Sequence, residues 1–379
     1  MSGQPIAFLI NTLGGGGAER VVTRLSSSLA TQGRRVLIIC LNSSQQAYPL
    51  HTGVAVHILI RERTAGNFVA RIQYAWQTFY RLMAVLKREK PGCLIAFMTS
   101  ANIWAGLTAG LRKIPYIVSE RNAPQYGVHQ LGFFSLRLCA ALYRRAAALV
   151  LPSAGIGEGL KRKKVFAGLS NDIVIHNPVE SRIDYAPARV YEKPFMLAVG
   201  RLTYQKGFDQ LVTAYSKLGP SAPDLLIAGQ GEEEQALRHQ ISELGLTGRV
   251  ILLGAIKQLQ GYYLQAELFI LSSRNEGYPN VLIEAMSCGC AVIATNCEFG
   301  PSEIIRHAEN GLLVENSNPP AMASAIRRLL RDHRLRNKLG HAAARIRETN
   351  SIEQISGRWL ALVNHSTAAG PLPCTETKL

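Results

Sequence analysis

Two glutamates separated by seven residues stand on either side of a proline, and this spacing can bring both carboxylates to one ligand. Pro279 suits the first position of a helix. Glu276 then lies in the loop before that helix, and Glu284 lies about a turn and a half inside it. Carboxylates accept hydrogen bonds from neighbouring hydroxyls, and the free N–H groups of a helix start, here at Asn280 and Val281, attract phosphate. The segment therefore predicts a ligand with hydroxyl-bearing rings and phosphate.

The ordinary alternative is an acidic residue before a helix together with a solvated helix glutamate. Ile283 and Ala285 flank Glu284, which indicates a partly buried, apolar surrounding. A carboxylate in such a place needs a partner. The ligand interpretation is therefore favoured.

Two cations follow an apolar run near residue 200. Arg201 and Lys206 stand between that run and a helical pattern, so both would flank the start of a helix. Fixed cations beside a helix N-terminus suit a diphosphate. Surface Arg and Lys are common, so this pair alone leaves a solvated surface equally open. It gains weight beside the two glutamates.

Four consecutive glycines, residues 14–17, separate another apolar run from a helical pattern. Glycine lets the backbone approach a ligand closely, and a helix start offers free N–H groups to an anion. No Gly-Lys-Ser/Thr follows, as in a Walker loop, and no acidic residue ends the next run, as in a dinucleotide site. A tight turn needs one or two glycines, so the run favours approach of an anion or a sugar to Gly16 and Gly17.

The elements that position these residues alternate between short apolar runs and helical patterns. Such alternation predicts α/β domains with parallel sheets, which bind ligands beyond the carboxyl ends of their strands. We expect strands over residues 6–13, 36–41, 54–60, 94–98, 116–119, 148–152, 195–199, 225–228, 250–253, 268–271 and 291–294. We expect helices over residues 18–32, 68–90, 207–218, 232–244 and 279–288.

A proline-containing stretch interrupts this alternation and divides the chain. We expect two doubly wound, Rossmann-like domains over residues 1–176 and 194–350, joined by a linker over 177–193 and facing each other across a cleft. A helix over 351–364 can pack back on the first domain. Residues 365–379 are expected to form a frayed tail.

Together, these motifs resemble the retaining glycosyltransferases of family 4 (glycosyl transferases group 1), which have the GT-B fold. The resemblance covers roughly residues 6–362. It rests on four features in order: the Gly-Gly-Ala-Glu-Arg start, Gly-Arg-Leu followed by Lys-Gly, the Gly229-Gln230-Gly231 turn, and the two glutamates. It implies that the first domain binds the acceptor and the second binds a nucleotide-sugar donor.

The resemblance also implies roles for individual residues. Arg201 and Lys206 would hold the donor diphosphate, Glu276 would contact the transferred sugar, and Glu284 would bind the ribose hydroxyls. We take Glu276, Arg201 and Lys206 as the catalytic set. Backbone contacts to the donor phosphate or base are implied for Gly16, Gly17, Gly254, Ala255 and Ile256.

One position departs from the family pattern. Many members carry a histidine at the end of the fifth N-terminal strand, whereas here Arg121 takes that place in the run Ser-Glu-Arg-Asn. The role of the histidine is therefore not carried over. Arg121, with Glu120 beside it, is expected to hold an acceptor or leaving phosphate, because an arginine cannot be a general base at working pH.

No metal and no other cofactor is expected. No two aspartates stand two residues apart, so an Asp-x-Asp metal site is absent. Cations and helix N-termini would then neutralise the leaving group. Cys288, Cys290 and Cys297 cluster without a histidine pair and are expected to be small buried residues. The seven scattered cysteines fit a reducing, cytosolic setting.

The net charge of +16 is uneven. Residues 1–185 hold 22 Lys and Arg against 8 Asp and Glu, a net of +14, which leaves +2 for the remainder. The first domain is therefore expected to face anionic lipid, a phosphorylated acceptor or nucleic acid, with composition drift as the alternative. Residues 68–90 carry apolar side chains, such as Ile72 and Trp76, at helical spacing among basic ones. Core packing explains such a stripe, and an interfacial role at anionic lipid is the alternative.

We therefore expect a retaining hexosyl- or N-acetylhexosaminyltransferase. It would move a sugar, from a UDP-sugar, to a lipid-linked saccharide in cell-surface polysaccharide or glycan assembly. It would be cytoplasmic and peripheral at the inner face of the cell membrane, since no apolar run is long enough to span a bilayer. The rivals are a sugar-nucleotide epimerase of the same fold and a basic nucleic-acid-binding protein. Nucleic acid is not expected as a partner, because no basic-aromatic recognition module is present.

Overall fold

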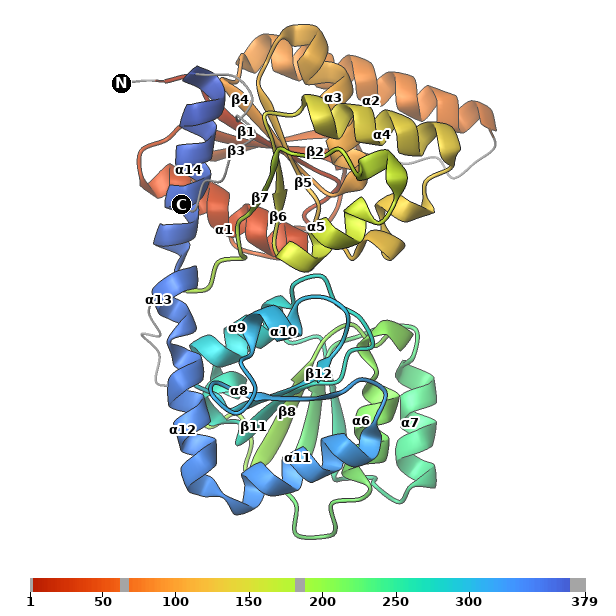
Figure 1. The fold of residues 1–379 in the computed structure, drawn as a ribbon, viewed down its shortest axis with the longest axis vertical. Helices are drawn as coiled ribbons and strands as arrows, with labels where there is room; N and C mark the ends of the chain where they lie inside the picture. The colour runs from red at the N-terminus through yellow and green to blue at the C-terminus, as the bar shows by residue number, and fades with distance from the viewer. Residues whose placement is uncertain (1–2, 62–67, 181–187, 369–379) are drawn as a thin grey trace. The chain divides into compact units, whose positions relative to one another are not determined.

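A computed structural model describes residues 3–61, 68–180 and 188–368 (Figure 1). The chain divides into two compact units. Unit 1 comprises Met1–Pro178 and Ile352–Leu379, and unit 2 comprises Val179–Ser351. Part of the expected linker, residues 181–187, and the end of the expected tail, residues 369–379, lie outside the described residues.

Unit 1 is built on a seven-stranded sheet in the order β3-β2-β1-β4-β5-β6-β7, in which all neighbouring strands are parallel. Most of these strands are runs of buried apolar residues, as expected when helices cover both faces of a parallel sheet. The strands are β1 (Ile6–Ile10), β2 (Val36–Asn42), β3 (Val54–Ile60), β4 (Cys93–Phe97), β5 (Tyr116–Ser119), β6 (Ala148–Leu151) and β7 (Asp172–Val174).

Helices cover both faces of this sheet (Figure 1). On one face α1 packs against α14, and on the other α3 lies between α2 and α4. The helices are α1 (Gly17–Thr31), α2 (Phe68–Glu89), α3 (Thr99–Arg112), α4 (Phe133–Arg145), α5 (Ala154–Lys161) and α14 (Ile352–Ala368), with short 3-10 turns at η1 (Pro124–Tyr126), η2 (Val128–Gln130) and η3 (Lys164–Phe166).

The C-terminal helix α14 belongs to unit 1 although it follows unit 2 in the chain. Trp359 is fully buried in the core of unit 1 and stacks on Phe97, with ring centroids 5.5 Å apart. The helix continues to Ala368, so the prediction that a frayed tail begins at His365 was wrong for its first four residues. The buried face of the helix extends to Ser366, and this burial keeps the last turn ordered.

Unit 2 is built on a six-stranded parallel sheet in the order β10-β9-β8-β11-β12-β13. Its strands are β8 (Phe195–Val199), β9 (Asp224–Ala228), β10 (Val250–Gly254), β11 (Leu268–Leu271), β12 (Val292–Asn296) and β13 (Leu312–Glu315). Its helices are η4 (Tyr204–Lys206), α6 (Phe208–Tyr215), α7 (Glu234–Glu243), α8 (Gln260–Gln265), α9 (Asn280–Ser287), α10 (Pro301–Ile304), α11 (Pro319–Arg331), α12 (His333–Ala344) and α13 (Ile346–Asn350).

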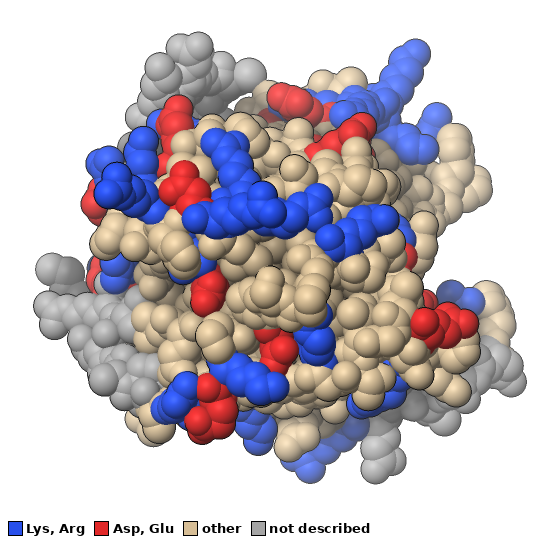
Figure 2. Space-filling model, turned by 90° about the horizontal axis from the view of Figure 1, so that it is seen from below, with Lys and Arg blue, Asp and Glu red and all other residues tan. Residues whose placement is uncertain are grey.

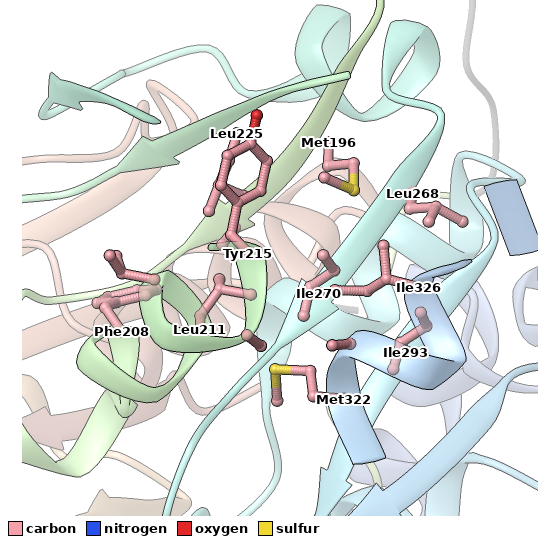
Figure 3. Packing of buried hydrophobic residues seen from close by; sticks show 14 of the residues in the cluster. Met196, Phe208, Leu211, Tyr215, Leu225, Leu268, Ile270, Ile293, Met322 and Ile326 are labelled. Carbon is pink, nitrogen blue, oxygen red and sulfur yellow. The ribbon is translucent and has the colours of Figure 1, made fainter. Parts of the chain in front are cut away.

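One core cluster of unit 2 packs α6 and α11 against the sheet. Figure 3 shows Leu211 of α6 and Met322 of α11 beside Ile270 and Ile293 of the central strands. All four of these side chains are at most 1% exposed. This packing fixes α6, and with it the loop that carries Arg201 and Lys206.

In both units the first strand is central, and the strand order reverses beside it. The reversal lies between β1 and β4 in unit 1 and between β8 and β11 in unit 2. At such a point the loops at the carboxyl edge diverge and leave room for a ligand. Within the described part of the chain, no helix has the length and apolar character needed to cross a membrane.

Candidate functional site

The carboxyl edge of unit 2 brings Lys206 and Glu276 together. Lys206 follows β8 and Glu276 follows β11, so the pair spans the place where the strand order reverses. The Lys206 Nζ atom lies 2.6 Å from Glu276 Oε1, and the two side chains are 15% and 7% exposed. Ser273 also donates a hydrogen bond to Oε1, at 2.6 Å. The sequence predicted both residues for one site, and the structure places them in direct contact.

Hydrogen bonds to the backbone connect the two loops of this site, one after β8 and one after β11. Arg274 N donates to Gln205 O at 2.8 Å, and Ser272 Oγ donates to Lys206 O at 2.9 Å. Gly207 has a φ of +63°, and a Cβ added there would lie 2.2 Å from Ser272 O. Only glycine allows this approach, so the Lys206-Gly207 pair is needed to seat the lysine against the end of β11.

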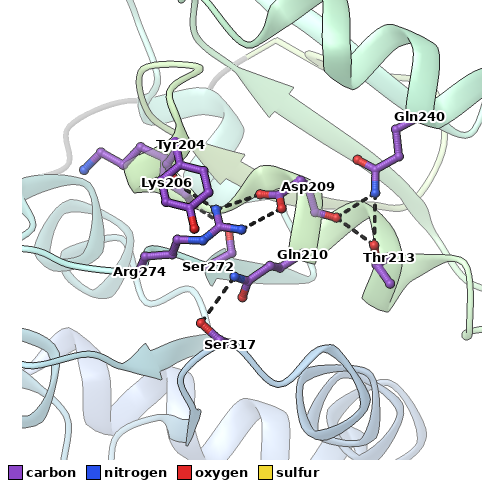
Figure 4. Close-up of polar contacts among 9 residues, drawn as sticks. All are labelled: Tyr204, Lys206, Asp209, Gln210, Thr213, Gln240, Ser272, Arg274 and Ser317. Atoms are coloured by element: carbon purple, nitrogen blue, oxygen red, sulfur yellow. Dashed lines mark hydrogen bonds and ion pairs between the residues drawn. The ribbon is translucent and has the colours of Figure 1, made fainter.

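Arg274, in the loop after β11, also binds the segment that contains Lys206 (Figure 4). Its guanidinium forms two hydrogen bonds to the Asp209 carboxylate, at 2.8 and 2.7 Å, and one to Tyr204 O at 2.7 Å. It also lies 3.9 Å from the centroid of the Tyr204 ring. The bonds to Asp209 raise the pKa of Arg274, so the clamp stays charged. The sequence reasoning missed Asp209 and Arg274 because they are distant in the chain.

The Gly-Gln-Gly turn predicted from the sequence lies against the strand that leads to Arg201. Gly229 has a φ of +151°, and a Cβ there would lie 1.8 Å from Gly200 O. A Cβ on Gly231 would lie 2.2 Å from Leu202 O. The turn therefore needs glycine because two backbone segments meet there. Arg201, between these contacts, has an exposed side chain.

Glu284 lies inside α9 and is 8% exposed. Tyr263 donates a 3.5 Å hydrogen bond to its Oε2 atom. The helix begins at Asn280, and Pro279 has an extended conformation as its N-cap, so the prediction that Pro279 occupies the first helical position was wrong by one residue. The first turn, at Asn280 and Val281, still follows the Glu276 loop directly, as the sequence indicated.

The segment predicted to hold the base also lies at the carboxyl edge of unit 2. Gly254 ends β10 with a φ of +70° and accepts a hydrogen bond from Gly229 N at 2.8 Å. Ala255 is exposed, and Ile256 packs partly against a core cluster that contains α9 residues. The backbone of this segment is therefore presented at the same edge as the Gly-Gln-Gly turn.

The cysteine cluster lies near these loops. Cys290 and Cys297 are buried, and Cys288 is half-buried. Burial, reinforced by the Glu276 carboxylate, raises the pKa of the Cys297 thiol to about 12. Within the described ranges, no group of three His, Cys, Asp or Glu side chains is arranged to hold a metal ion.

Gly16 and Gly17 belong to unit 1, where the glycine run joins β1 to α1. Gly16 is the N-cap of α1, and no side chain caps the helix there. The Glu19 carboxylate lies over Gly16, with Oε2 2.3 Å from the position of an added Cβ. Tyr48 donates a 2.9 Å hydrogen bond to Gly15 O. The helix start is thus occupied by an internal carboxylate, which an anion would have to displace.

Glu120 and Arg121 also belong to unit 1, directly after β5. Glu120 is fully buried and accepts hydrogen bonds of 2.8 Å from Thr99 and from Tyr143. Burial raises the pKa of its carboxyl group, and the two hydroxyl donors partly offset this effect. The sequence did not predict Thr99, at the start of α3, or Tyr143, near the end of α4, as partners of Glu120.

Arg121 is 8% exposed and points into unit 1. It donates a 2.6 Å hydrogen bond to Asn177 Oδ1. Its guanidinium carbon lies 4.7 Å from the Phe97 ring centroid and 5.7 Å from that of Trp359. Burial lowers its pKa to about 9, and Glu120 opposes this shift. The residue therefore connects the end of β5 to α14 and to the segment that leaves unit 1.

The two Rossmann-like units and the loops at their carboxyl edges are the features of a GT-B glycosyltransferase, and comparison with known proteins agrees. A family model described as glycosyl transferases group 1 matches residues 182–346, and one described as glycosyl transferase 4-like domain matches residues 16–169. Together they cover most of the chain. The protein belongs to this glycosyltransferase family and is an enzyme of that class.

Two relatives from Campylobacter jejuni align over nearly their whole length. One is the N-acetylgalactosamine-N,N'-diacetylbacillosaminyl-diphospho-undecaprenol 4-alpha-N-acetylgalactosaminyltransferase, 29% identical over 88% of this chain and 92% of its own. The other is the GalNAc-alpha-(1->4)-GalNAc-alpha-(1->3)-diNAcBac-PP-undecaprenol alpha-1,4-N-acetyl-D-galactosaminyltransferase, 27% identical over 94% of this chain and 98% of its own.

A solved structure of Anabaena Alr3699/HepE in complex with UDP has a TM-score of 0.79. It is 17% identical and covers 95% of this chain and 99% of its own. This likeness confirms the fold class predicted from the sequence.

Proposed function

We propose that the protein transfers a sugar from a UDP-sugar to a lipid-linked saccharide with retention of the anomeric configuration. The observation that carries this proposal is the contact between Lys206 and Glu276 at the reversal point of the unit 2 sheet. The Campylobacter relatives, whose names give undecaprenyl-linked acceptors, support the acceptor class. The Anabaena structure with UDP supports the nucleotide.

The donor diphosphate would be met by Arg201, Lys206 and the first turn of α9. An anion gains from fixed cations and from the free N–H groups of a helix start. In the structure Lys206 is paired with Glu276. The glutamate would hold the lysine ammonium group in place while that group binds a donor phosphate. We propose that these groups balance the charge of the departing UDP without a metal ion.

Glu276 and Glu284 would bind the hydroxyls of the transferred sugar and of the ribose. Each carboxylate is at least nine-tenths buried, and a carboxylate in such a position is a strong acceptor for hydroxyl groups. Glu276 is held by Ser273 and Lys206, which limits its rotation. Its proposed role is to position the sugar so that the anomeric carbon faces the acceptor.

Retention requires that the new bond form on the face from which UDP departs. The bond between the anomeric carbon and the phosphate oxygen breaks as the acceptor oxygen bonds to the same carbon. The departing phosphate takes the acceptor proton, so no enzyme nucleophile or general base is needed. Glu120 and Arg121 are proposed to support the acceptor site in unit 1. They would do so by fixing the end of β5 and, through the hydrogen bond from Arg121, the segment around Asn177.

The place of action is proposed to be the cytoplasmic face of the cell membrane. Six free cysteines in the described part of the chain fit a reducing compartment. A lipid-linked acceptor would be presented there at a membrane surface.

The test is to incubate the protein with a panel of nucleotide sugars and undecaprenyl-diphosphate-linked saccharides. The lipid product is then identified by mass and its new linkage by NMR. We expect one hexose or N-acetylhexosamine to be added from a UDP-sugar in the donor's own α or β configuration. A product of inverted configuration, or a free epimerised nucleotide sugar, would contradict the proposal.

A further inference from the structure

Two helices of unit 1, α2 and α4, carry aromatic and aliphatic side chains that face solvent. The exposed fractions are 75% for Phe68, 56% for Trp76 and 62% for Tyr80 on α2, and 60% for Phe133 and 85% for Phe134 on α4. Ile72 of α2 is 43% exposed. These six residues are here called the aromatic surface.

The row on α2 is separate from the face that packs against the sheet. Phe68, Ile72, Trp76 and Tyr80 follow one another at intervals of four, which places them along one side of a helix. The buried positions of α2 form another set: Thr78, Leu82, Val85 and Leu86. Core packing therefore accounts for the second set, and the interfacial alternative weighed from the sequence applies to the first.

This surface is unusual for the molecule. Fourteen large apolar side chains are exposed in the described ranges; twelve belong to unit 1, and only Tyr204 and Leu244 belong to unit 2. Exposed apolar side chains that contact one another mark interaction sites more often than scattered ones do. Here such contacts occur within α2 and within α4, the two helices that flank α3. Within unit 1, Phe133 and Phe134 are in edge-to-face contact at 5.5 Å, and Trp76 stacks on Tyr80 at 5.3 Å.

The charged residues around the aromatic surface are almost all cationic. The three helices of this layer contain a single acidic residue, Glu89, at the last position of α2. Arg71 and Arg137 lie within the surface, and the Arg137 guanidinium is 4.2 Å from the Phe133 ring centroid. By contrast, the face in Figure 2 carries Lys and Arg side chains with Asp and Glu among them. Positive charge alone therefore does not single out a docking face, whereas aromatic side chains together with unopposed cations do.

The position of the surface fits a lipid-linked substrate. In a parallel sheet each crossover helix starts near the carboxyl end of the preceding strand. The first turns of α2 and α4, with Phe68, Phe133 and Phe134, therefore lie at the carboxyl edge of unit 1, and Figure 1 shows both at the same end of the helical layer. Trp76 and Tyr80 follow about two and three turns further along α2. Glu120 follows β5 at this edge.

We propose that the aromatic surface docks on an anionic phospholipid bilayer. The aromatic rings would enter the headgroup boundary, and Arg71 and Arg137 would meet lipid phosphates. A bilayer is favoured over a second copy of the chain because the surface presents cations with scarcely any carboxylates to pair with those of a copy. The reason for docking, access to a lipid-linked acceptor, rests on the proposed function. Docking itself can be tested without any acceptor.

The test measures sedimentation of the full chain with phosphatidylcholine vesicles, with and without 30% phosphatidylglycerol, at low and high salt. The variant combines Trp76→Ser, Phe133→Ser and Phe134→Ser. The matched control is Leu111→Ser, because Leu111 is 66% exposed at the far end of α3 in the same helical layer. We expect the wild type and the control to bind the anionic vesicles at low salt, and the triple variant to bind at least about tenfold more weakly.

Quenching of Trp76 by brominated lipid adds a direct reading, since Trp359 is fully buried and Trp104 is half-buried. Quenching of the wild type that is lost in Trp76→Phe supports insertion. The proposal is overturned if the wild type stays in the supernatant, or if the triple variant binds as tightly as the control. It is also overturned if the wild type is a dimer that the triple variant dissociates. The affinity for UDP, measured without lipid, should be equal in all variants, so failure of the donor site would be seen separately.

Discussion

At the residue scale, a largely buried lysine and a largely buried glutamate share one site. Lys206 and Glu276 are largely shielded from water, so removing one leaves the other partly uncompensated. The same shielding makes each a strong partner for a ligand of opposite charge or for a hydroxyl. The pair therefore stabilises the two loops and can also bind a ligand.

Replacing Lys206 by methionine should weaken UDP binding about 10- to 100-fold, since a charge-assisted hydrogen bond to phosphate contributes about 1.5–3 kcal/mol. Isothermal calorimetry with UDP gives the dissociation constant. Lys217→Met, an exposed lysine of unit 2, is the matched control and should bind UDP like the wild type. An unchanged affinity in Lys206→Met would remove the lysine from the donor site.

The burial of Glu120 predicts how the stability of the protein depends on pH. Its pKa is raised in the folded protein, mainly by burial. A carboxyl group with a raised folded pKa contributes most to stability below its unfolded pKa, about 4.3, and this contribution is lost as pH rises through the folded pKa. Glu120→Gln stays neutral, so its stability relative to the wild type should increase from pH 4.5 to pH 8. Urea unfolding at both values checks this, and a difference that does not change with pH would contradict it.

Much of the candidate site was predictable at this scale, and the reason is local. Arg201, Lys206 and Glu276 lie in short segments after strands, and Glu284 lies in the helix that follows the Glu276 loop, so the sequence pattern places all four near one edge. The Asp209–Arg274 contact was not predictable, because it joins the first turn of α6 to the loop after β11, and only the folded sheet brings the two together. The inward direction of Arg121 was missed for the same reason, since its partners Asn177 and Trp359 come from distant segments.

At the scale of elements, the strands and helices that the sequence predicted were found to within a few residues. The helices α11 and α12 of unit 2 were not predicted. Two strands were missed, β7 and β13, each at an edge of its sheet. They are three and four residues long, and neither is fully buried, so their apolar pattern is weak. The first predicted strand was too long, because residues after Ile10 already form the loop that leads to the glycines.

The Gly-Gln-Gly turn gives the clearest prediction for an element. Gly229→Ala should destabilise the protein by about 2–4 kcal/mol, because the new methyl group would meet the Gly200 carbonyl. Gly245→Ala is the matched control: it has a φ of +64° but open space around it, so only backbone strain of about 1 kcal/mol is expected. Chemical denaturation of both variants tests the comparison. Equal losses would show that close packing does not require the glycine.

At the scale of the whole molecule, burial of the cysteines sets their chemistry. Burial raises the pKa of Cys40, Cys93, Cys139 and Cys297 to about 12 and that of Cys288 to about 11. The thiolate is the reactive form, so these thiols should react slowly in the native protein. Low reactivity would agree with the structural role expected from the sequence.

The thiol prediction is tested with the Cys374→Ser variant, which removes the one cysteine outside the described residues. At pH 8 the native variant should react with a thiol reagent far more slowly than the same protein in guanidinium chloride, where all six remaining cysteines should react. A fast stoichiometric reaction of several native thiols would contradict the burial described for unit 1 and unit 2.

The family and the two-domain fold could be predicted because their signals recur along the whole chain. The positions of the aromatic side chains could not, because a helix with an apolar stripe has the same pattern whether that stripe faces a core or solvent. Trp76 and Leu82 illustrate this, since both are apolar residues of α2 but only Leu82 is buried.

The measurement that tests the central claim most directly is acceptor-dependent release of UDP by the wild type and by Glu276→Gln. The substitution keeps the shape of the side chain and removes its charge. We predict that the wild type releases UDP from its UDP-sugar only when a lipid-linked saccharide is present, and that Glu276→Gln is slower by about 100-fold or more. Glu309→Gln, an exposed glutamate of unit 2, should match the wild type. Wild-type turnover in Glu276→Gln would contradict the assignment of the site.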